Sequence, residues 1–583
     1  MTNKELAKIF YEIAQFLAIE EVAFKPAAYE KAAFSLETLE EDVREIYQQG
    51  GGKAIEKIPG IGKSIAEKII EYLETGRIKY YEEYKKKYPF DLEELTAVEG
   101  IGPKIARDLY KYLKIRNLAD LERAAREGKI RNLPHFGEQS EKNILEGIRF
   151  LKRSKGRFLL GEILPRVREI EQELSRLKEI KKLSVCGSVR RMKETIGDVD
   201  FLAVTKEPKK VMDFFCSLPE VIKIWGKGVT KSSVRFKEGF DVDLRLVSEE
   251  AFGAALQYFT GSKEHNIKLR RIALEKGFKL NEYGLFRGSR RLGGKTEEEI
   301  YHFLGMSCPA PELREDRGEV EAARRSFLRQ SPGLPCLIEL KDIKGDLHCH
   351  SDWDGGEDSL EELAEEAIKR GYQYLGIADH TKFLKIENGL DEKRLLEEHK
   401  AIEAINQKYE KAAVNFRLLH GCEANILNDG SLDIKEEKVL GKLDYVIAGI
   451  HSNFKISREE MTARMIRAMK NPFVKIISHP TGRLLKKRDE YQIDIDKILR
   501  AAKETKTALE INSFPQRLDL NDFNVKKAVE EGVRLFINTD AHRRSQLGFM
   551  EYGVSVARRG WAEKKDILNS RPFKDLLKIL RQK

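Results

Sequence analysis

Residues 186–200 read Cys-Gly-Ser-Val-Arg-Arg-Met-Lys-Glu-Thr-Ile-Gly-Asp-Val-Asp and lead into an apolar run. Alternate residues of a strand point to one side of a sheet, so Asp198 and Asp200 are expected to share a face. Residues 241–247 alternate in the same way and add Asp243 from a second strand. Three such carboxylates suit Mg²⁺, and a Gly-Ser turn beside arginines suits a polyphosphate. The sequence therefore predicts two-metal nucleotidyl transfer on a mixed α+β domain.

The same stretch resembles the palm of family X DNA polymerases, the group of DNA polymerase beta. The resemblance continues through residues 258–262, 266–270 and 273–283, and it covers roughly the first 315 residues. Gly-Ser followed by Gly-Asp-Val-Asp is shared with the wider nucleotidyltransferase superfamily, whereas the ordered combination is far more specific. The resemblance implies a palm followed by a thumb-like domain.

The resemblance assigns a role to each acidic residue of the palm. It implies that Asp198 and Asp200 bind both Mg²⁺ ions, which Mn²⁺ can replace. It also implies that Asp243 holds the catalytic ion beside the primer 3′-hydroxyl, and that Arg245 orients Asp243. Asp241 shares the face, but the family pattern Asp-x-Arg favours Asp243 as the ligand. Gapped or primer-template DNA and dNTPs are the implied substrates.

The resemblance also implies nucleotide contacts around these carboxylates. The turn at 187–197 is expected to hold the β- and γ-phosphates, and the segment 258–261 to exclude a ribose 2′-oxygen. Lys263 is either a contact to the incoming nucleotide or an ordinary solvated lysine. The expected contacts are Gly187, Ser188, Arg191, Gly197, Tyr258, Phe259, Gly261, Lys263, Asn266 and Arg270.

Composition limits the remaining possibilities. The 583 residues predict roughly three to five domains. A net charge of +10 is only a mild positive excess and does not by itself establish nucleic-acid binding. The six cysteines lie singly, without the spacing of a zinc ribbon or a disulfide framework. No apolar run reaches membrane-spanning length and the N-terminus does not look like a signal peptide, so a cytoplasmic monomer is expected.

Turn-rich repeats interrupt the helical N-terminal region. Residues 58–62 read Ile-Pro-Gly-Ile-Gly, residues 98–102 read Val-Glu-Gly-Ile-Gly, and residues 133–137 form a weaker third copy. They resemble the helix-hairpin-helix motif, in which glycines let backbone amides approach a DNA phosphate; a tight turn between two helices is the structural alternative. Carbonyls nearby could also hold a monovalent cation, as the resemblance implies. The expected DNA contacts are Gly60, Gly62, Lys63, Gly100, Gly102 and Lys104.

Lys68 follows the first of these turns and aligns with the lysine that forms a Schiff base with 5′-deoxyribose phosphate. The resemblance thus implies a lyase, with Lys25 and Tyr29 in a 5′-phosphate pocket. Ser64 and Tyr80 stand where the animal enzyme has lysines of that pocket. A simple DNA contact is the alternative role of Lys68, because a nucleophilic lysine needs a lowered pKa.

From residue 345 onward, short apolar strands alternate with long helical patterns, which predicts a barrel of parallel strands. The expected strands are residues 375–377, 445–448, 474–477, 508–511 and 535–537. Eight of the eleven histidines lie in residues 341–583, and six of them fall at strand ends. The carboxyl ends of barrel strands carry the chemistry of this fold. Imidazole and carboxylate ligands together suit Zn²⁺, Mn²⁺ or Fe²⁺, so a second metal site is predicted there.

This C-terminal pattern resembles the PHP (polymerase and histidinol phosphatase) phosphoesterase domain, whose members bind up to three metal ions with nine ligands. Where the family has Ser-Asp-Gly, this chain has Asp354-Gly355-Gly356, so Asp354 is expected to serve as the ninth ligand. The resemblance implies Zn²⁺ or Mn²⁺, 3′→5′ exonuclease activity, and Arg517 either on a DNA phosphate or as an ordinary surface arginine. The expected ligands are His348, His350, Asp354, His380, Glu423, His451, His479, Asp540 and His542.

The whole chain is therefore predicted to be a multidomain α+β and α/β protein that fills short gaps in DNA repair and carries an attached nuclease. Two alternatives stay open: a nucleotidyltransferase acting on RNA or a small molecule, and a non-catalytic protein that binds DNA ends. The expected boundaries are 1–90 for a lyase-like helical domain, 91–150 for a helix-hairpin-helix domain, 151–250 for a nucleotidyltransferase-type palm, 251–315 for the thumb, 316–340 for a linker and 341–583 for a distorted (β/α) barrel.

Overall fold

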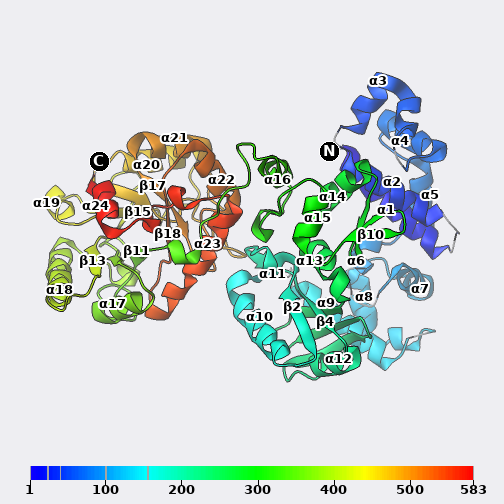
Figure 1. The fold of residues 1–583 in the computed structure, drawn as a ribbon, viewed down its shortest axis with the longest axis horizontal. Coiled ribbons are helices and arrows are strands. Elements are labelled where there is room, and N and C mark those ends of the chain that lie inside the picture. Colours follow the sequence, from blue (N-terminus) through cyan, green and yellow to red (C-terminus); the bar gives the residue numbers. More distant parts are fainter. Residues whose placement is uncertain are drawn as a thin grey trace.

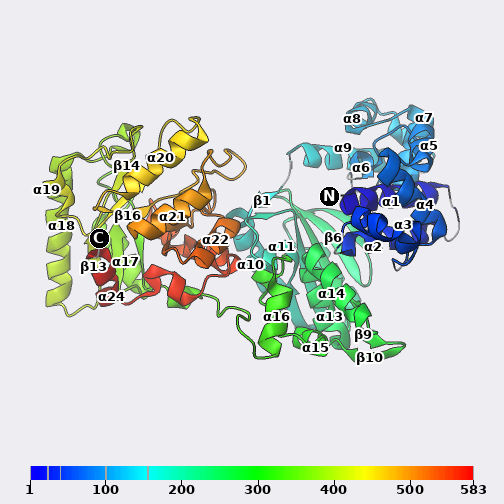
Figure 2. The same cartoon turned by 90° about the horizontal axis from the view of Figure 1, so that it is seen from above.

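The computed structural model describes residues 2–20, 22, 25–39, 41–58, 60–96, 98, 101–134, 136–153 and 157–581. The molecule is elongated, with the C-terminal barrel at one end and the N-terminal helices at the other (Figures 1 and 2). The palm and thumb lie between them. Within these described ranges, no helix is both long and apolar enough to cross a membrane.

The N-terminal region is a set of helices around a shared apolar core. Phe10 and Ile13 recur at helical spacing and are fully buried. Two of the helices begin directly after Gly62 and Gly102, which are extended and provide no side-chain cap. The helices are α1 (Thr2–Ile19), α2 (Lys25–Thr38), α3 (Val43–Glu56), α4 (Lys63–Thr75), α5 (Lys79–Lys87), α6 (Leu92–Thr96), α7 (Pro103–Leu113), α8 (Leu118–Arg126) and α9 (Glu138–Arg153).

The palm is a five-stranded sheet in the order β2-β4-β7-β6-β5, with β4 and β7 parallel and the other pairs antiparallel. Val199 and Val242 face the apolar cluster that includes residues of α10 and α12, so the alternating aspartates face the other side. The elements are β1 (Phe158–Leu159), α10 (Leu160–Ser175), β2 (Ile180–Val185), α11 (Gly187–Arg190), β3 (Thr195–Ile196), β4 (Asp198–Thr205), α12 (Pro208–Cys216), β5 (Val221–Lys227), β6 (Lys231–Phe236) and β7 (Asp241–Leu246).

The thumb combines helices with a three-stranded antiparallel sheet in the order β10-β9-β8. Its elements are α13 (Phe252–Thr260), α14 (Lys263–Glu275), β8 (Lys279–Asn281), β9 (Gly284–Arg287), β10 (Arg290–Gly293) and α15 (Glu297–Phe303).

The segment expected to be a linker, 316–340, is not separate from the thumb. Helix α16 (Glu319–Phe327) forms within it, and its Val320 and Ala323 are buried in one cluster with Leu269 and Tyr301. The sequence signal for a linker was its run of prolines and charges. The two apolar residues on one face of α16 override that signal, because they complete the thumb core.

The C-terminal domain is a barrel of parallel strands in two sheets, β11-β12-β13 and β14-β15-β16-β17-β18. A bridge between His380 and Glu423 joins the sheets, and one between Cys349 and Ala541 closes the circle. The strands are β11 (Gly345–Cys349), β12 (Tyr374–Ile377), β13 (Arg417–His420), β14 (Glu423–Asn425), β15 (Val446–Gly449), β16 (Val474–Ile477), β17 (Ala508–Asn512) and β18 (Leu535–Asn538).

Side chains fill the barrel interior, so the chemistry is confined to its carboxyl end. Leu347, Leu419, Ile447 and Phe536 form a buried cluster that also includes Leu576 of the last helix. Helices surround the strands (Figure 1). They are α17 (Leu360–Lys369), α18 (Glu392–Lys411), α19 (Glu437–Leu440), α20 (Arg458–Met469), α21 (Ile495–Thr505), α22 (Asp522–Glu531), α23 (Met550–Arg559) and α24 (Phe573–Arg581).

Candidate active sites of the palm and the barrel

The three predicted palm carboxylates converge. In the parallel register of β4 and β7, Asp200 lies opposite Asp243, and Asp198 lies two residues earlier on the same face. Burial raises the pKa of Asp200 to about 7, and the negative charges of Asp198 and Asp243 add to the shift. A cluster in which carboxylates raise one another's pKa favours cation binding, and its oxygen donors fit Mg²⁺ or Mn²⁺.

Basic residues differentiate the two aspartates of β7. Lys231 Nζ lies 2.7 Å from Asp243 Oδ2, and Arg245 lies 3.6 Å from the same oxygen. Asp241 instead accepts two hydrogen bonds from Arg235, at 2.8 and 2.7 Å, and one from Trp225 Nε1 at 2.8 Å. Asp241 is therefore held in a structural ion pair, which favours Asp243 as the metal-binding residue of this strand.

The predicted phosphate-binding turn lies beside these carboxylates. Gly187 opens α11 with φ near +62°, and a Cβ there would lie 3.1 Å from Asp200 Oδ2, so a side chain would crowd the site. Ser188 is the second residue of α11. Gly197 immediately precedes β4, where a Cβ would lie 3.6 Å from Arg157.

Arg191, at the end of α11, is tied to the thumb. Its Nε donates to Glu315 Oε1 at 2.9 Å, and its Nη1 donates to the Thr260 carbonyl. Its neighbour Arg190 pairs through both Nη atoms with Glu297. Sequence reasoning did not identify Glu315 or Glu297, because their partners lie more than a hundred residues away along the chain.

The thumb residues expected at the nascent base pair form a compact group. Asn266 is buried and donates from Nδ2 to the Tyr258 carbonyl at 2.7 Å, while its Oδ1 accepts from Gln257 at 2.6 Å. Arg270 Nε lies 3.4 Å from the Asn266 carbonyl. Asn266 thus fixes the backbone at Tyr258, in the segment that is expected to exclude a ribose 2′-oxygen.

Aromatic contacts place the remaining thumb residues. The Phe259 ring lies under the Arg245 guanidinium at 4.5 Å, and Gly261 follows with φ near +72°, where a Cβ would lie 3.0 Å from Arg191. Lys263 Nζ lies 5.9 Å from the centre of the Tyr11 ring of α1. The Lys263 amine therefore lies near helix α1 of the N-terminal region.

In the N-terminal region, Lys68 lies close to the residues expected around a 5′-phosphate. Its Nζ is 3.1 Å from the Ser64 carbonyl and 4.9 Å from the centre of the Tyr80 ring. Burial lowers the pKa of Lys68, and the nearby charge of Lys25 acts in the same direction. Tyr29 is buried and stacks on Tyr80 at 6.3 Å.

The hairpin turns place backbone amides at helix N-termini. The Ile61 amide donates to the Ile58 carbonyl and the Ile101 amide to the Val98 carbonyl, both at 3.0 Å, so the same hydrogen bond closes both turns. Gly60 has φ near +86°. Lys63 and Lys104 lie in the first turns of α4 and α7. The predicted contact at Gly100 lies outside the described residues.

The barrel histidines surround one carboxylate, Glu423. Its Oε2 lies 3.0 Å from His380 Nδ1 and 3.5 Å from His348 Nε2. Its Oε1 lies 3.0 Å from His479 Nε2 and 3.4 Å from His451 Nε2. Burial alone would raise the pKa of Glu423, but these imidazoles hold it well below its ordinary value.

The donor atoms of this cluster fit metal ions. Four ring nitrogens are buried: Nε2 of His348, His350 and His451, and Nδ1 of His380. Among the described residues, none of the four has a hydrogen-bond partner. Four overlapping groups bring their ligand atoms within 4.8 Å of one another: His350, His380 and His542; His348, His350 and Glu423; His380, Glu423 and His451; and His350, Asp354 and Asp379. Asp540 Oδ1 adds an oxygen 3.4 Å from His350 Nε2.

Asp354, the expected ninth ligand, lies inside this cluster, where it groups with His350 and Asp379. Its Oδ2 also accepts from His350 Nδ1 and from the His380 amide, both at 2.8 Å, and its Oδ1 accepts from the Gly356 amide at 3.0 Å. Asp354 therefore orients the His350 ring and its loop. Its place as a ninth metal ligand, one residue before the family position, stays a prediction.

Sequence reasoning missed Glu510, which plays the same part for His348. Glu510 Oε1 lies 2.7 Å from His348 Nδ1, and its Oε2 accepts from the His479 amide at 2.8 Å. The signal was present, because Glu510 is an acidic residue inside the apolar strand β17. Buried carboxylates that hold the distal nitrogen of a ligand histidine fix its tautomer.

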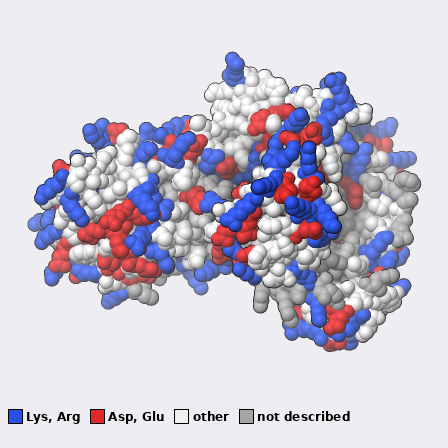
Figure 3. Space-filling view, turned by 60° about the horizontal axis from the view of Figure 1, so that its bottom comes forward, with Lys and Arg blue, Asp and Glu red and all other residues white. Residues whose placement is uncertain are grey.

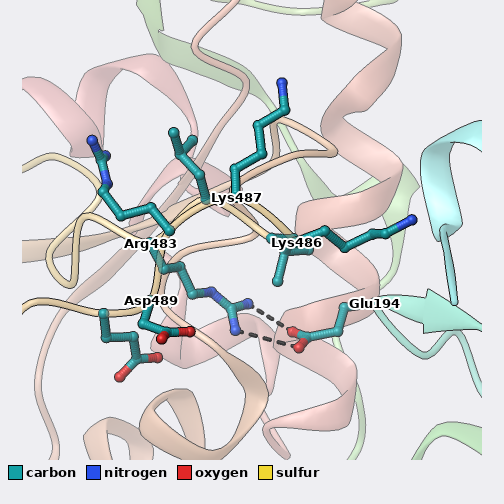
Figure 4. Close-up of a pocket in the computed structure, with 9 residues that line it drawn as sticks. Glu194, Arg483, Lys486, Lys487 and Asp489 are labelled. Carbon is teal, nitrogen blue, oxygen red and sulfur yellow. Dashed lines mark hydrogen bonds and ion pairs between the residues drawn. The ribbon is translucent and has the colours of Figure 1, made fainter. Parts of the chain in front are cut away.

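Two cavities adjoin at the barrel mouth. One, of about 220 Å³, is lined by Leu484, Phe514, Gln516, Arg517, Asp540, His542 and Gln546. Arg517 Nε lies 3.4 Å from Asp540 Oδ2 there. The other, of about 540 Å³, is lined by Glu194 of the palm and by residues 483–490, including Leu484 (Figure 4). Arg483 and Glu194 pair across it at 2.7 Å.

Charge is mixed on one face of the molecule. On the face drawn in Figure 3, acidic and basic side chains are interspersed across the whole length of the molecule. This agrees with the mild net charge of +10.

Comparison with known proteins places these sites in a family. The descriptions that match are "Helix-hairpin-helix domain" at residues 1–78, "SAM-like Helix-hairpin-helix tandem" at 92–149, "DNA polymerase beta thumb" at 255–315 and "PHP domain" at 346–514.

Relatives extend this result to the whole length. The chain is 40% identical over 587 residues to the DNA polymerase/3′-5′ exonuclease PolX of Bacillus subtilis (strain 168), with 100% of both chains covered. It is 33% identical over 236 residues to a probable phosphatase of Thermoanaerobacter sp. (strain X514), covering 39% of this chain and 89% of that protein. A probable phosphatase of Caldicellulosiruptor bescii is 31% identical over 219 residues, which cover 36% of this chain and 84% of that protein. The chain belongs to the family X DNA polymerases that carry a C-terminal PHP domain.

Proposed function

We propose that the protein fills short gaps in DNA with dNTPs at the palm and removes nucleotides from DNA 3′ ends at the barrel. The observation that carries the proposal is the presence of two separate clusters of ionisable side chains in one chain. Asp200 and Asp243 face each other across β4 and β7, and the imidazoles around Glu423 gather in the barrel.

At the palm, Asp198, Asp200 and Asp243 would hold two divalent ions, Mg²⁺ or Mn²⁺. Such ions lower the pKa of a primer 3′-hydroxyl and stabilise charge on the transferring phosphoryl group. The chain itself does the positioning. Gly187 lets the start of α11 approach the phosphates, and Arg191 supplies a fork of donors to them. Lys231, now paired with Asp243, would have to release that carboxylate.

At the barrel, the histidines with Glu423 and Asp540 would hold up to three ions, Zn²⁺ or Mn²⁺. These ions would supply an activated water and stabilise the leaving oxygen of a phosphodiester. Glu510 and Asp354 accept from Nδ1 of His348 and His350 and so direct Nε2 of each ring inward. Arg517 lines the cavity beside Asp540 and is placed to bind a DNA phosphate.

The helical N-terminal region would hold the DNA without reading its sequence. The uncapped N-termini of α4 and α7, with Lys63 and Lys104 in their first turns, suit backbone phosphates. The carbonyls of the two hairpins would also suit a monovalent cation.

A lyase activity at Lys68 is a second candidate function. It is favoured by the lowered pKa that burial gives this amine, because only the neutral amine forms a Schiff base. Lys25 and Tyr29 would hold the 5′-phosphate of the substrate. Trapping with borohydride on an incised abasic site tests it: wild type should cross-link and Lys68→Ala should not.

Extension of a primer across a short gap, with dNTPs compared with rNTPs, tests the polymerase assignment. We expect the gap to be filled with dNTPs and rNTPs to be used poorly, since Tyr258 to Gly261 crowd the sugar. A preference for rNTPs would support the RNA alternative. Binding to gapped DNA without any extension would support the non-catalytic alternative.

Degradation of a mismatched 3′ end tests the barrel assignment. Arg517→Ala should raise the KM for DNA, because a phosphate contact is lost. Arg417→Ala is the matched control. Arg417 pairs with Glu403 and begins β13, so it lies at the amino end of the strand and away from the carboxyl end of the barrel. Equal effects of the two substitutions would contradict the role of Arg517.

A further inference from the structure

Arg559 reaches from the barrel domain into the palm. It is the last residue of α23, which lies on the side of the barrel that faces the palm and α16 (Figure 1). Its side chain is only 3% exposed. Its Nη1 donates to the backbone carbonyl of Arg191 at 2.9 Å and to Glu315 Oε1 at 3.1 Å. Its Nη2 donates to Asp522 Oδ2 at 2.5 Å.

Glu315 is shared between this arginine and the palm. Its Oε1 accepts from Arg191 Nε as well as from Arg559, and its Oε2 lies 3.7 Å from Lys193. Burial would raise the pKa of Glu315, but the positive charges of Arg559, Arg191 and Lys193 hold it below its ordinary value. The carboxylate is therefore ionised, and its charge is divided among cations from two domains.

The chain of contacts continues to the segment that joins the domains. Asp522, at the start of α22, also lies 3.1 Å from Nη1 of Arg317, which precedes α16. Arg191, Glu315, Arg559, Asp522 and Arg317 thus form one alternating series of charges. An ion pair whose only role was to join two domains would not need to contact the nucleotide-binding turn. Arg559, however, binds both the backbone carbonyl of Arg191 and its partner Glu315.

We propose that Arg559 of the barrel domain is a positioning residue for the nucleotide site of the palm. It holds the carbonyl of Arg191 and takes part of the Glu315 charge, which weakens the hold of Glu315 on the Arg191 guanidinium. To reach a triphosphate, that guanidinium has to leave Glu315 and the Thr260 carbonyl. The inference rests on the proposed role of Arg191 in dNTP binding.

Loss of the Arg559 charge has a definite electrostatic direction. Glu315 would keep only Arg191 and Lys193 as cationic partners, so its hold on Arg191 would tighten. The negative charge of Glu315 beside the phosphate turn would also be less compensated and would repel a triphosphate. Both effects weaken dNTP binding, whereas the three metal-binding aspartates remain untouched.

The test compares Arg559→Gln with Arg168→Gln in the full-length protein. Arg168 also joins palm and barrel, through Glu551 of α23 at 2.6 Å, but it is exposed and far from Arg191 in the contact network. We expect the KM for dNTP to rise about tenfold in Arg559→Gln with kcat within about twofold. Arg168→Gln should leave both constants unchanged.

Exonuclease activity separates positioning from folding. Because α23 packs against β17 and β18, a substitution that merely destabilised the barrel would reduce degradation of 3′ ends. Unchanged exonuclease activity with a raised KM for dNTP supports the proposal. An equal loss of both activities, or an unchanged KM, overturns it. If Arg559→Gln does not fold, Arg559→Lys decides in the same way, with a rise of about threefold expected because the charge stays but the fork is lost.

A second substitution tests the route through Glu315. In the Arg559→Gln background, Glu315→Gln removes the uncompensated charge, so the KM should return toward the wild-type value. Purely additive effects of the two changes would overturn the proposal. Measuring Arg191→Gln as well distinguishes a failure of the proposed function from a failure of this inference. If it leaves the KM unchanged, the proposed function of Arg191 fails; if it raises the KM while Arg559→Gln does not, only this inference fails.

Discussion

At the scale of single residues, the palm gives different surroundings to two aspartates that the alternation of β7 alone cannot distinguish. Asp241 and Asp243 lie on one face of β7. Arg235 holds Asp241 through two hydrogen bonds, while Asp243 lies opposite Asp200. The family pattern pointed to Asp243, but the reason lies in the partner of Asp241, which is supplied by a different strand.

Asp243→Asn should lower kcat for dNTP incorporation on the order of 10³-fold with little change in thermal midpoint, because a metal ligand is lost. Asp241→Asn is the matched control. It should lower the thermal midpoint, since the buried Arg235 would lose its ionised hydrogen-bond acceptor, and keep kcat within about tenfold. Kinetics and thermal melts of both variants check this. A greater catalytic loss in Asp241→Asn would reverse the assignment.

The pKa of Asp200 predicts how metal affinity depends on pH. With a pKa raised to about 7 by burial and by two carboxylates, Asp200 is mostly protonated at pH 6 and mostly ionised at pH 8. Protons therefore compete with the cation at low pH, and the half-saturating Mg²⁺ concentration should rise about tenfold from pH 8 to pH 6. Titration calorimetry measures it. A constant affinity over this range would contradict the prediction.

Asp354 is both a predicted metal ligand and a hydrogen-bond partner of His350, and one substitution distinguishes the two roles. Asp354→Asn should lower exonuclease activity about 10- to 100-fold through loss of the His350 orientation, while the bound metal content stays close to wild type. Asp540→Asn should lose both activity and metal. Elemental analysis of the two purified variants decides the point: if Asp354→Asn loses as much metal as Asp540→Asn, then Asp354 is a ligand after all.

At the scale of elements, the sequence predicted strands well where they are apolar and regular. The stretches at 375–377, 445–448, 474–477, 508–511 and 535–537 all lie within or overlap strands of the barrel. Strand β14 could not be predicted, because Glu423-Ala-Asn425 is short and polar. Its parallel pairing with β15 and the bridge to His380 create it, and such long-range pairing leaves no local signal.

Glu297 of α15 connects the thumb to the palm. It accepts from Arg190 of α11 and from the buried Arg314. Burial would raise its pKa, but these two arginines lower it from 4.5 to about 2. The resulting stabilisation is fully present above the unfolded value near 4.5 and is lost as the pH falls toward 2.

Glu297→Gln should therefore lower the free energy of unfolding by about 3 kcal/mol at pH 6. The difference from wild type should shrink to roughly half at pH 3, because wild type has by then lost part of the stabilisation. Denaturant titrations at the two pH values measure both differences. A deficit that is the same at pH 3 and pH 6 would show that charge is not the source of this stabilisation.

At the scale of the whole molecule, the arrangement of the domains was beyond sequence reasoning. Arg483 pairs with Glu194 and Arg559 with Glu315, and the two members of each pair are more than two hundred residues apart in the chain. Single charged residues of this kind have no pattern that marks them as partners. The donor sets could be predicted because catalytic residues recur at strand ends, where the periodicity of the fold places them.

We expect the palm sheet and the barrel to act as two independent active sites of one chain. Asp200→Ala and His350→Ala, assayed on one gapped DNA with a mismatched 3′ end, distinguish the two sites. We predict that Asp200→Ala loses extension and keeps degradation of the 3′ end, and that His350→Ala does the reverse. Loss of both activities in either variant, or of neither, would rule out two independent sites at these residues.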